Sequence, residues 1–148
     1  MSKRIKSKYA QIYEHEWNGN LGRVLSDHGS MAAIFYVYMF SNTHRNLSGL
    51  YRLPAAYVEA DIGINKDDFE AIIAQFNNLG FVEYDWISSE IFVVDMLLTQ
   101  VGELTSEKDK RWISVESDLA KASSEPLKQR FRSIYQKPIS TSYPQDWI

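Results

Sequence analysis

The longest run of hydrophobic residues in the chain covers Met31 to Phe40. It is ten residues long, about half of the ~20 residues that cross a bilayer, so it predicts a buried core helix rather than a membrane span. Because the run is apolar on every side, we expect this helix to lie at the centre of the domain with other elements packed around it. Asp27 or Ser30 is expected to cap its start, and the polar residues from Ser41 onward end it.

The residues after this run alternate between turn signals and short periodic segments. Gly49–Leu53 predicts a strand, and Pro54 suits the first turn of a helix over 55–62 that Gly63 ends. Asn65 is expected to cap a second helix that ends at Gly80. The apolar residues of that helix recur at helical spacing: Phe69, Ile72, Ile73, Phe76 and Leu79.

Two further strands are predicted over Phe81–Asp85 and Ile91–Val94, joined by the loop Trp86–Glu90 as a hairpin. The order helix, strand, helix, turn, helix, hairpin is typical of a winged helix-turn-helix. In that arrangement the strand at Gly49 is the third strand of the sheet, and the helix from Asn65 to Leu79 is the recognition helix. The sequence therefore predicts a mainly α fold of the α+β class.

Two additional helices are predicted near the C-terminus, at about 107–122 and 126–137, the second capped by Ser124. Their buried stripes are predicted from helical spacing: Trp112, Val115, Leu119 and Ala122 in the first, and Leu127, Phe131, Ile134 and Tyr135 in the second. They are expected to pack on the winged core or on a second subunit. The predicted division of the chain is a basic arm (1–18), the winged helix-turn-helix (19–97), a helical extension (98–137) and a tail or the start of a linker (138–148).

Several of these segments carry a family resemblance. The matching residues are Ser41–Asn46, Gly49–Leu53, Leu79–Asp85 and Ile91–Asp95, with a fainter match at Arg130–Tyr135 and Tyr143–Pro144. Residues 9–97 as a whole resemble the N-terminal winged-helix domain of phage replication-initiation proteins and, more distantly, DnaD-like primosome proteins. The resemblance implies binding of origin or single-stranded DNA, self-association and recruitment of replication proteins. It also implies that the chain is a truncated N-terminal domain, because such proteins continue past a linker into a second domain.

The amino-acid composition excludes several kinds of functional site. The 148 residues contain no cysteine, which excludes disulfides, thiolate metal sites and a cysteine nucleophile. Aromatic residues make up 14% of the chain, which argues against a disordered chain. The sequence has neither a glycine-rich phosphate loop nor a histidine spacing suited to a metal, so we expect no enzyme activity, no cofactor and no metal site. A cytoplasmic protein without a membrane partner is expected.

Charge is distributed unevenly. Residues 1–50, 51–100 and 101–148 carry net charges of +3, -7 and +1. The predicted recognition helix is acidic and the hairpin carries no basic residue, so we expect DNA, double or single stranded, to be bound mainly elsewhere. The leading candidates lie in the N-terminal arm and the last helix, with additional candidates between them: Lys3, Arg4, Lys6, Lys8, Arg45, Arg52, Lys66, Gln75, Asn78, Lys128, Arg130 and Arg132.

The alternative to DNA binding is a protein-protein module. In that hypothesis the winged helix forms a homodimer or binds a replication or host protein, and the acidic helix is the contact surface. Its candidate interface residues are Asp67, Glu70 and Asn77. Polar residues that merely solvate an amphipathic helix would show the same pattern, so the sequence leaves both hypotheses open.

Overall fold

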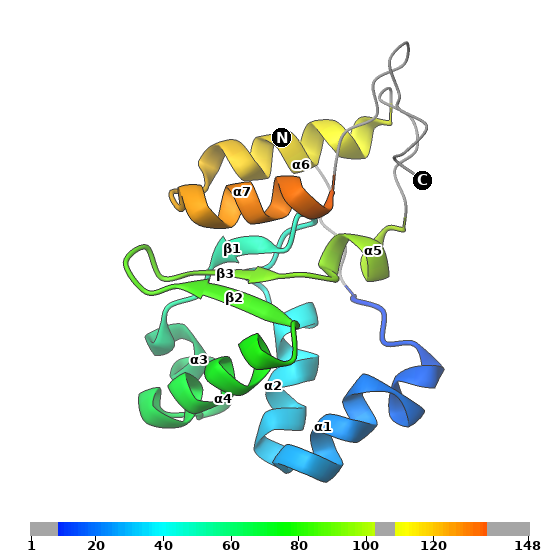
Figure 1. Cartoon of the computed structure of the whole chain (residues 1–148), viewed down its shortest axis with the longest axis vertical. Coiled ribbons are helices and arrows are strands. Elements are labelled where there is room, and N and C mark those ends of the chain that lie inside the picture. Colours follow the sequence, from blue (N-terminus) through cyan, green and yellow to red (C-terminus); the bar gives the residue numbers. More distant parts are fainter. Residues whose placement is uncertain (1–8, 103–108, 136–148) are drawn as a thin grey trace.

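A computed structural model describes residues 9–102 and 109–135. The chain is mainly helical with one three-stranded antiparallel sheet, so the predicted α+β class is confirmed. The elements in chain order are η1 (Glu14–Asn18), α1 (Asn20–His28), α2 (Ser30–Ser41), β1 (Leu50–Arg52), α3 (Ala55–Ile62), α4 (Lys66–Asn78), β2 (Val82–Asp85), β3 (Glu90–Val93), α5 (Met96–Gln100), α6 (Lys110–Lys121) and α7 (Glu125–Ile134). The sheet separates α1–α4 on one face from α6 and α7 on the other (Figure 1). Within the described residues, no helix combines the length and hydrophobicity needed to cross a bilayer.

The sheet joins the two helical layers because its side chains alternate between faces. The strand order is β1-β3-β2, with Leu50 opposite Phe92 and Tyr51 opposite Ile91. Leu50 and Phe92 belong to the core shared with α6 and α7, whereas Tyr51 and Ile91 belong to the core shared with α1–α4. Successive residues of a strand point to opposite faces, so three short strands cover two separate cores.

The larger core is built on α2. Phe35 is fully buried there, and its ring lies 5.8 Å from Tyr38, 5.7 Å from Phe69 and 5.8 Å from Phe76. Contacts at these distances between tilted aromatic rings stabilise a core beyond the area they bury. The aromatic residues of the predicted core helix therefore bind α2 to α4.

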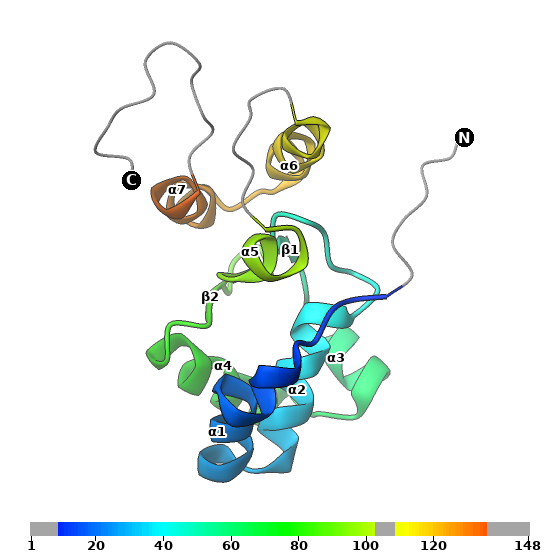
Figure 2. The same cartoon turned by 90° about the vertical axis from the view of Figure 1, so that its right-hand side faces the viewer.

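The smaller core holds the C-terminal helices against the sheet (Figure 2). The side chains of Trp112, Val115 and Leu119 from α6 are buried, as are Leu127 and Phe131 from α7. All five were predicted from their helical spacing, and their burial confirms it. The predicted start of this first helix near residue 107 lies outside the described residues.

Turn and cap residues end most elements where the sequence predicts. The Asn65 side chain accepts a hydrogen bond of 2.9 Å from the Asp68 amide, and Ser124 accepts one of 3.2 Å from the Leu127 amide. Gly63 and Gly80 both have positive φ, at 73° and 81°. These features confirm the predicted starts of α4 and α7 and the predicted ends of α3 and α4.

The prediction for the start of α2 is wrong. Gly29, at φ 93°, occupies the cap position without a side-chain hydrogen bond. It is the only residue between α1 and α2, so Asp27 lies inside α1 and Ser30 is already the first residue of α2. A one-residue joint between helices requires a backbone conformation that glycine adopts most readily.

Three predictions of burial are also wrong. The core helix is not buried on every side, since Met31 is 43% and Ile34 is 54% exposed. Leu79, just beyond the end of α4, is 48% exposed, and Ile134, the last residue of α7, is 37% exposed. The hairpin loop is one residue shorter than predicted, as Glu90 pairs with Asp85 in the sheet. Glu90 is buried and does not charge the tip of the hairpin.

Candidate nucleic-acid interface

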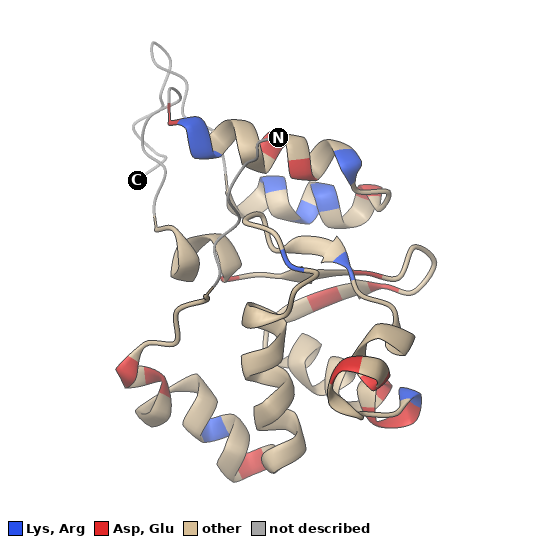
Figure 3. Cartoon of the chain, turned by 180° about the vertical axis from the view of Figure 1, so that it is seen from behind, with Lys and Arg blue, Asp and Glu red and all other residues tan. Residues whose placement is uncertain are grey.

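The exposed side of α4 is acidic. Asp67 is exposed in its first turn together with the more covered Asp68, and Glu70 follows one turn later. The cation predicted to contact DNA, Lys66, lies 3.8 Å from Glu70 in an ion pair within the helix. In Figure 3 the acidic residues of α3 and of the start of α4 form one cluster. This surface repels phosphate, as the sequence predicts.

The polar residues near the end of α4 have different environments. The Asn77 side-chain amide donates a hydrogen bond of 3.0 Å to the Val82 carbonyl, so this side chain fixes the turn into β2. Asn78 is exposed and Gln75 is partly buried. Asn77, predicted as an interface residue, therefore has a structural role in this turn that its position in the sequence does not indicate.

The three cations of α7 are all engaged by carboxylates of the same chain. Lys128 lies 3.4 Å from Glu125, and Arg130 forms an ion pair with Glu83 of β2. Both terminal nitrogens of Arg132 donate to Glu116 of α6, at 2.8 and 2.7 Å. Phosphate would have to displace these partners, so α7 is a weaker candidate than its sequence suggests.

Two other candidate cations, Arg45 and Arg52, lie in the loop before β1 and at the end of β1. Arg45, in the loop between α2 and β1, donates a hydrogen bond of 3.3 Å to the Tyr9 carbonyl. The arm residues Lys3, Arg4, Lys6 and Lys8 lie outside the described residues, but Lys8 is covalently bonded to Tyr9. The basic arm therefore joins the described fold next to Arg45.

Arg52 is the last residue of β1 and is exposed. Its guanidinium donates a hydrogen bond of 2.9 Å to the Tyr57 hydroxyl and lies 5.6 Å from the centroid of that ring. No carboxylate of the described residues lies within ion-pair distance of Arg52. The tyrosine orients the guanidinium while leaving its charge unneutralised.

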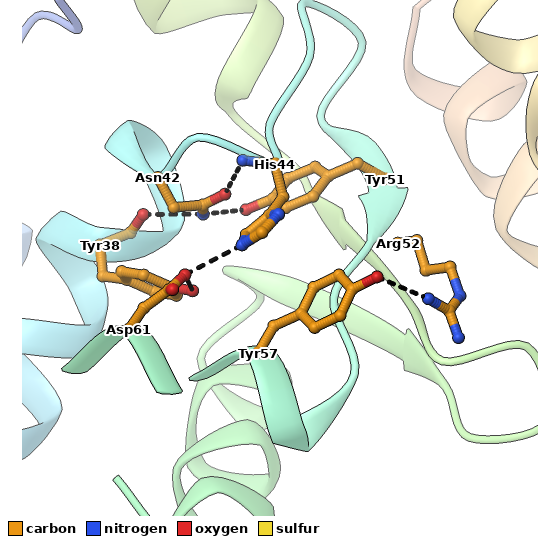
Figure 4. A network of polar contacts seen from close by, with 7 residues as sticks. All are labelled: Tyr38, Asn42, His44, Tyr51, Arg52, Tyr57 and Asp61. Atoms are coloured by element: carbon orange, nitrogen blue, oxygen red, sulfur yellow. Dashed lines mark hydrogen bonds and ion pairs between the residues drawn. The ribbon is translucent and has the colours of Figure 1, made fainter. Parts of the chain in front are cut away.

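His44 stacks on Tyr57 at 4.6 Å between ring centroids, and its Nε2 lies 2.9 Å from Asp61 (Figure 4). The Tyr38 hydroxyl donates a second hydrogen bond, of 2.7 Å, to the same carboxylate oxygen. These two contacts, Tyr38 first, lower the pKa of Asp61 below its ordinary value. The loop between α2 and β1 is thereby tied to the end of α3.

The loop is also fixed from inside. The Asn42 side-chain amide donates to the Tyr38 carbonyl and to the Tyr51 hydroxyl, each at 2.9 Å. The Asn42 side-chain oxygen in turn accepts the His44 amide hydrogen at 2.9 Å. Asn42 and Tyr51 are both buried, and burial raises the pKa of Tyr51. The polar network of Figure 4 holds the loop in one conformation.

We expect Asp61→Asn to destabilise the protein in a pH-dependent way. The hydrogen bonds from Tyr38 and His44 favour the ionised carboxylate of Asp61 in the folded state. The stabilisation from these bonds is therefore fully present above the ordinary pKa of 3.8 and is lost as pH falls through the lowered pKa of the folded state. The difference in urea midpoint between wild type and variant should be largest above about pH 6 and should shrink as pH falls below the ordinary pKa of 3.8. Asp27→Asn, at an exposed site near the end of α1, serves as the control. A difference that is independent of pH would contradict the role of the carboxylate.

A cleft of about 550 Å³ lies between β1 and the turn from α6 to α7. Arg52 and Lys121 both line it, although they belong to different layers. His44, Asn46, Ser88 and Ser123 add groups that can form hydrogen bonds. The carboxylates of Glu90 and Asp118 also line the cleft, and the Glu90 carboxylate accepts the amide hydrogens of Ser123 and Ser124.

Lys121 is a candidate that the sequence did not single out. It lies in the last turn of α6 and gives no motif of its own. Only the packing of α6 and α7 on the sheet brings it to the cleft that Arg52 lines. The term β1 face is used below for four residues: Arg45, Arg52, Lys121 and the neighbouring His44.

Comparisons with known proteins add no assignment. No protein-family model matches the chain, and no curated protein or solved structure is significantly similar to it. Among the described residues, no group of three or more histidine, aspartate or glutamate side chains is arranged to hold a metal ion. The candidate interface therefore rests on geometry and charge.

Proposed function

We propose that this chain is a non-catalytic nucleic-acid-binding module that contacts phosphate through the β1 face and the N-terminal arm. The observation that carries the proposal is the contact between Arg45 and the Tyr9 carbonyl. Tyr9 directly follows the segment of the sequence that contains Lys3, Arg4, Lys6 and Lys8. Clustered cations supply most of the affinity of proteins for nucleic acid.

We further propose that the architecture is a winged helix-turn-helix with two added helices. The order α2, β1, α3, α4, β2, β3 and the strand order β1-β3-β2 support this assignment. The added helices pack on the outer face of the sheet, so the hairpin is held between two layers. Only its tip, from Trp86 to Ser89, projects beyond them (Figure 1).

The resemblance to phage replication initiators gives the biological setting of the proposal. It suggests DNA as the nucleic acid and replication proteins as additional partners. Recognition through α4 would be the standard mode for the fold, but the acidic start of α4 makes the β1 face the better phosphate contact. The same acids disfavour a homodimer formed through α4, because each copy would oppose its own charges.

The proposal is tested by measuring binding of labelled single-stranded and duplex DNA across a salt series by fluorescence anisotropy. Log affinity should fall linearly with log salt, and Arg45→Ala, Arg52→Ala and Lys121→Ala should each reduce the slope by about one. Replacing all four arm cations, Lys3, Arg4, Lys6 and Lys8, should reduce it by about three to four.

Arg132→Ala is the matched control, because Glu116 already neutralises this guanidinium. Its slope should equal that of the wild type. A reduction as large as that for Arg52→Ala would place the phosphate path along α7 instead of the β1 face. If neither DNA binds at low salt, the proposed function is wrong.

A further inference from the structure

The tip of the β2–β3 hairpin exposes two large hydrophobic side chains. Ile87 is 99% exposed and Trp86 is 50% exposed. Turns of this kind are usually made of glycine, proline, asparagine, aspartate or serine, so an isoleucine at the tip is uncommon. The Ile87 side chain belongs to neither core of the protein, because almost all of its surface faces solvent. Ile87 is therefore available to a partner molecule.

The backbone of the tip is held in one conformation. The Asp85 carboxylate accepts the amide hydrogen of Ile87 at 2.9 Å and that of Ser88 at 3.3 Å. The Leu53 amide, just after β1, donates a hydrogen bond of 2.8 Å to the Ser89 carbonyl. Isoleucine is itself stiff about its first side-chain torsion. Ile87 is therefore a rigid projection on a fixed turn.

The Trp86 ring connects the tip to the larger core. Its centroid lies 4.2 Å from the ring of Tyr84 and 6.0 Å from the ring of Phe69. Phe69 is 0% exposed, so the half-exposed indole rests on a buried side chain. A tip that is ordered before it binds loses little conformational entropy on contact with a partner.

Two cations of the β1 face lie beside Ile87. Ile87, Arg52 and Lys121 all line the cleft between β1 and the turn from α6 to α7. The hydrogen bond from Leu53 to Ser89 connects the tip to the residue that follows Arg52. A phosphate bound by Arg52 or Lys121 would therefore place its nucleic acid next to an exposed apolar side chain.

The charges around the tip favour contact with bases rather than with phosphate. The hairpin from Val82 to Val93 contains no basic residue, and Asp85 begins its tip. Glu90 and Asp118 add carboxylates to the cleft lining, so phosphate contact is confined to the two cations. The faces of stacked bases are the apolar part of a duplex. Isoleucine is one of the side chains that proteins insert between base steps as a wedge.

We propose that Ile87 is a wedge that enters the base stack of a DNA duplex while Arg52 and Lys121 contact the neighbouring phosphates. The wedge unstacks one base step and bends the duplex. It rests on the proposed function, because the duplex must first be bound at the β1 face. Local opening of the base stack is an additional activity that phosphate contacts alone do not provide.

The experiment uses a short duplex that carries 2-aminopurine, a base whose fluorescence rises when it leaves the stack, beside a central TA step. TA steps deform easily, so a wedge enters there at the lowest cost. At saturating wild-type protein the fluorescence should rise, while the anisotropy of a label at the duplex end reports binding. Wild type should also bind a duplex with a central mismatch on the order of tenfold more tightly than the matched duplex, since part of the unstacking cost is absent there.

Ile87→Ser is the test variant, because serine is a usual turn residue and is too small and polar to act as a wedge. It should lose both the fluorescence rise and the preference for the mismatch, at an unchanged salt slope, since no charge is altered. Ile87→Leu should keep both, because leucine also serves as a wedge. Ile113→Ser is the matched control, at a residue of α6 that is 70% exposed, and should behave as wild type.

The two readouts separate the wedge from the proposed function. Wild-type protein that binds DNA without a fluorescence rise, or an Ile87→Ser variant that keeps the rise, would overturn the wedge and leave the proposed function standing. If no duplex binds at low salt, both are wrong. Because Ile87 is 99% exposed, Ile87→Ser should keep the urea midpoint of wild type, so a lost rise would not result from unfolding.

Discussion

Phe35→Ala is expected to lower the free energy of unfolding by about 3–5 kcal/mol, the range for removing a fully buried phenylalanine from a core. Phe35 is 0% exposed and lies between Tyr38 of its own helix and Phe69 and Phe76 of α4. Alanine suits the interior of a helix, so the loss comes from the cavity and the missing ring contacts rather than from helix propensity. Urea unfolding followed by circular dichroism at 222 nm measures the change.

Two variants separate burial from other effects of the Phe35 substitution. Phe35→Leu keeps most of the volume and should cost less than about 1.5 kcal/mol. Ile113→Ala changes an exposed helical residue and should stay within about 0.5 kcal/mol. A loss below about 1 kcal/mol for Phe35→Ala would show that α2 and α4 are not joined by this cluster.

The sequence predicts the elements around α2 and α4 well because each has a local signal. Asn65 caps α4, Gly63 and Gly80 end helices, and the spacing of Phe69 to Phe76 matches the buried face. Such signals depend on residues within one or two turns of each other. They therefore need no knowledge of the tertiary structure.

Two helices, α1 and α5, were missed. The apolar residues Leu21, Val24 and Leu25 of α1 do recur at helical spacing, but a glycine interrupts the pattern. In α1, Gly22 lies inside a helix, where glycine is unfavourable. Its presence is explained by η1, because a Cβ there would lie 2.1 Å from the Trp17 carbonyl oxygen. The five residues of α5 are too few for a helical period, although Met96 and Leu97 are buried. Both helices are stabilised by tertiary packing rather than by their own sequence.

The candidate site was only partly predictable for the same reason. Arg45 and Arg52 were additional candidates because of their charge, and the sequence also correctly predicted the acidity of α4. The carboxylates that neutralise Arg130 and Arg132 come from β2 and α6, so their pairing depends on how α7 packs. Lys121 reaches the β1 face by the same packing. Local sequence patterns do not predict ion pairs between segments that are far apart in the chain.

The C-terminal helices matter to the site as much as to stability. Their packing covers Leu50 and Phe92 on the outer face of the sheet and converts the end of β1 into one wall of a cleft. The buried carboxylate of Glu90 is the polar link in this arrangement. It accepts hydrogen bonds from the Ser123 amide at 2.9 Å, the Ser124 amide at 2.7 Å and the Ser88 hydroxyl at 2.9 Å.

Glu90→Ala is therefore expected to lower the free energy of unfolding by about 2–4 kcal/mol, because buried donors lose their acceptor. The cleft lies beside these donors, so water can replace the carboxylate as the acceptor for some of them. The expected loss of unfolding free energy is therefore smaller than it would be for three fully buried donors. Glu90→Gln retains one acceptor oxygen, so its loss of unfolding free energy should be about half as large. Glu125→Ala, at an exposed carboxylate of α7, should change the free energy of unfolding by no more than about 0.5 kcal/mol. Urea unfolding measures all three. An unchanged unfolding midpoint for Glu90→Ala would show that apolar packing alone holds the helices on the sheet.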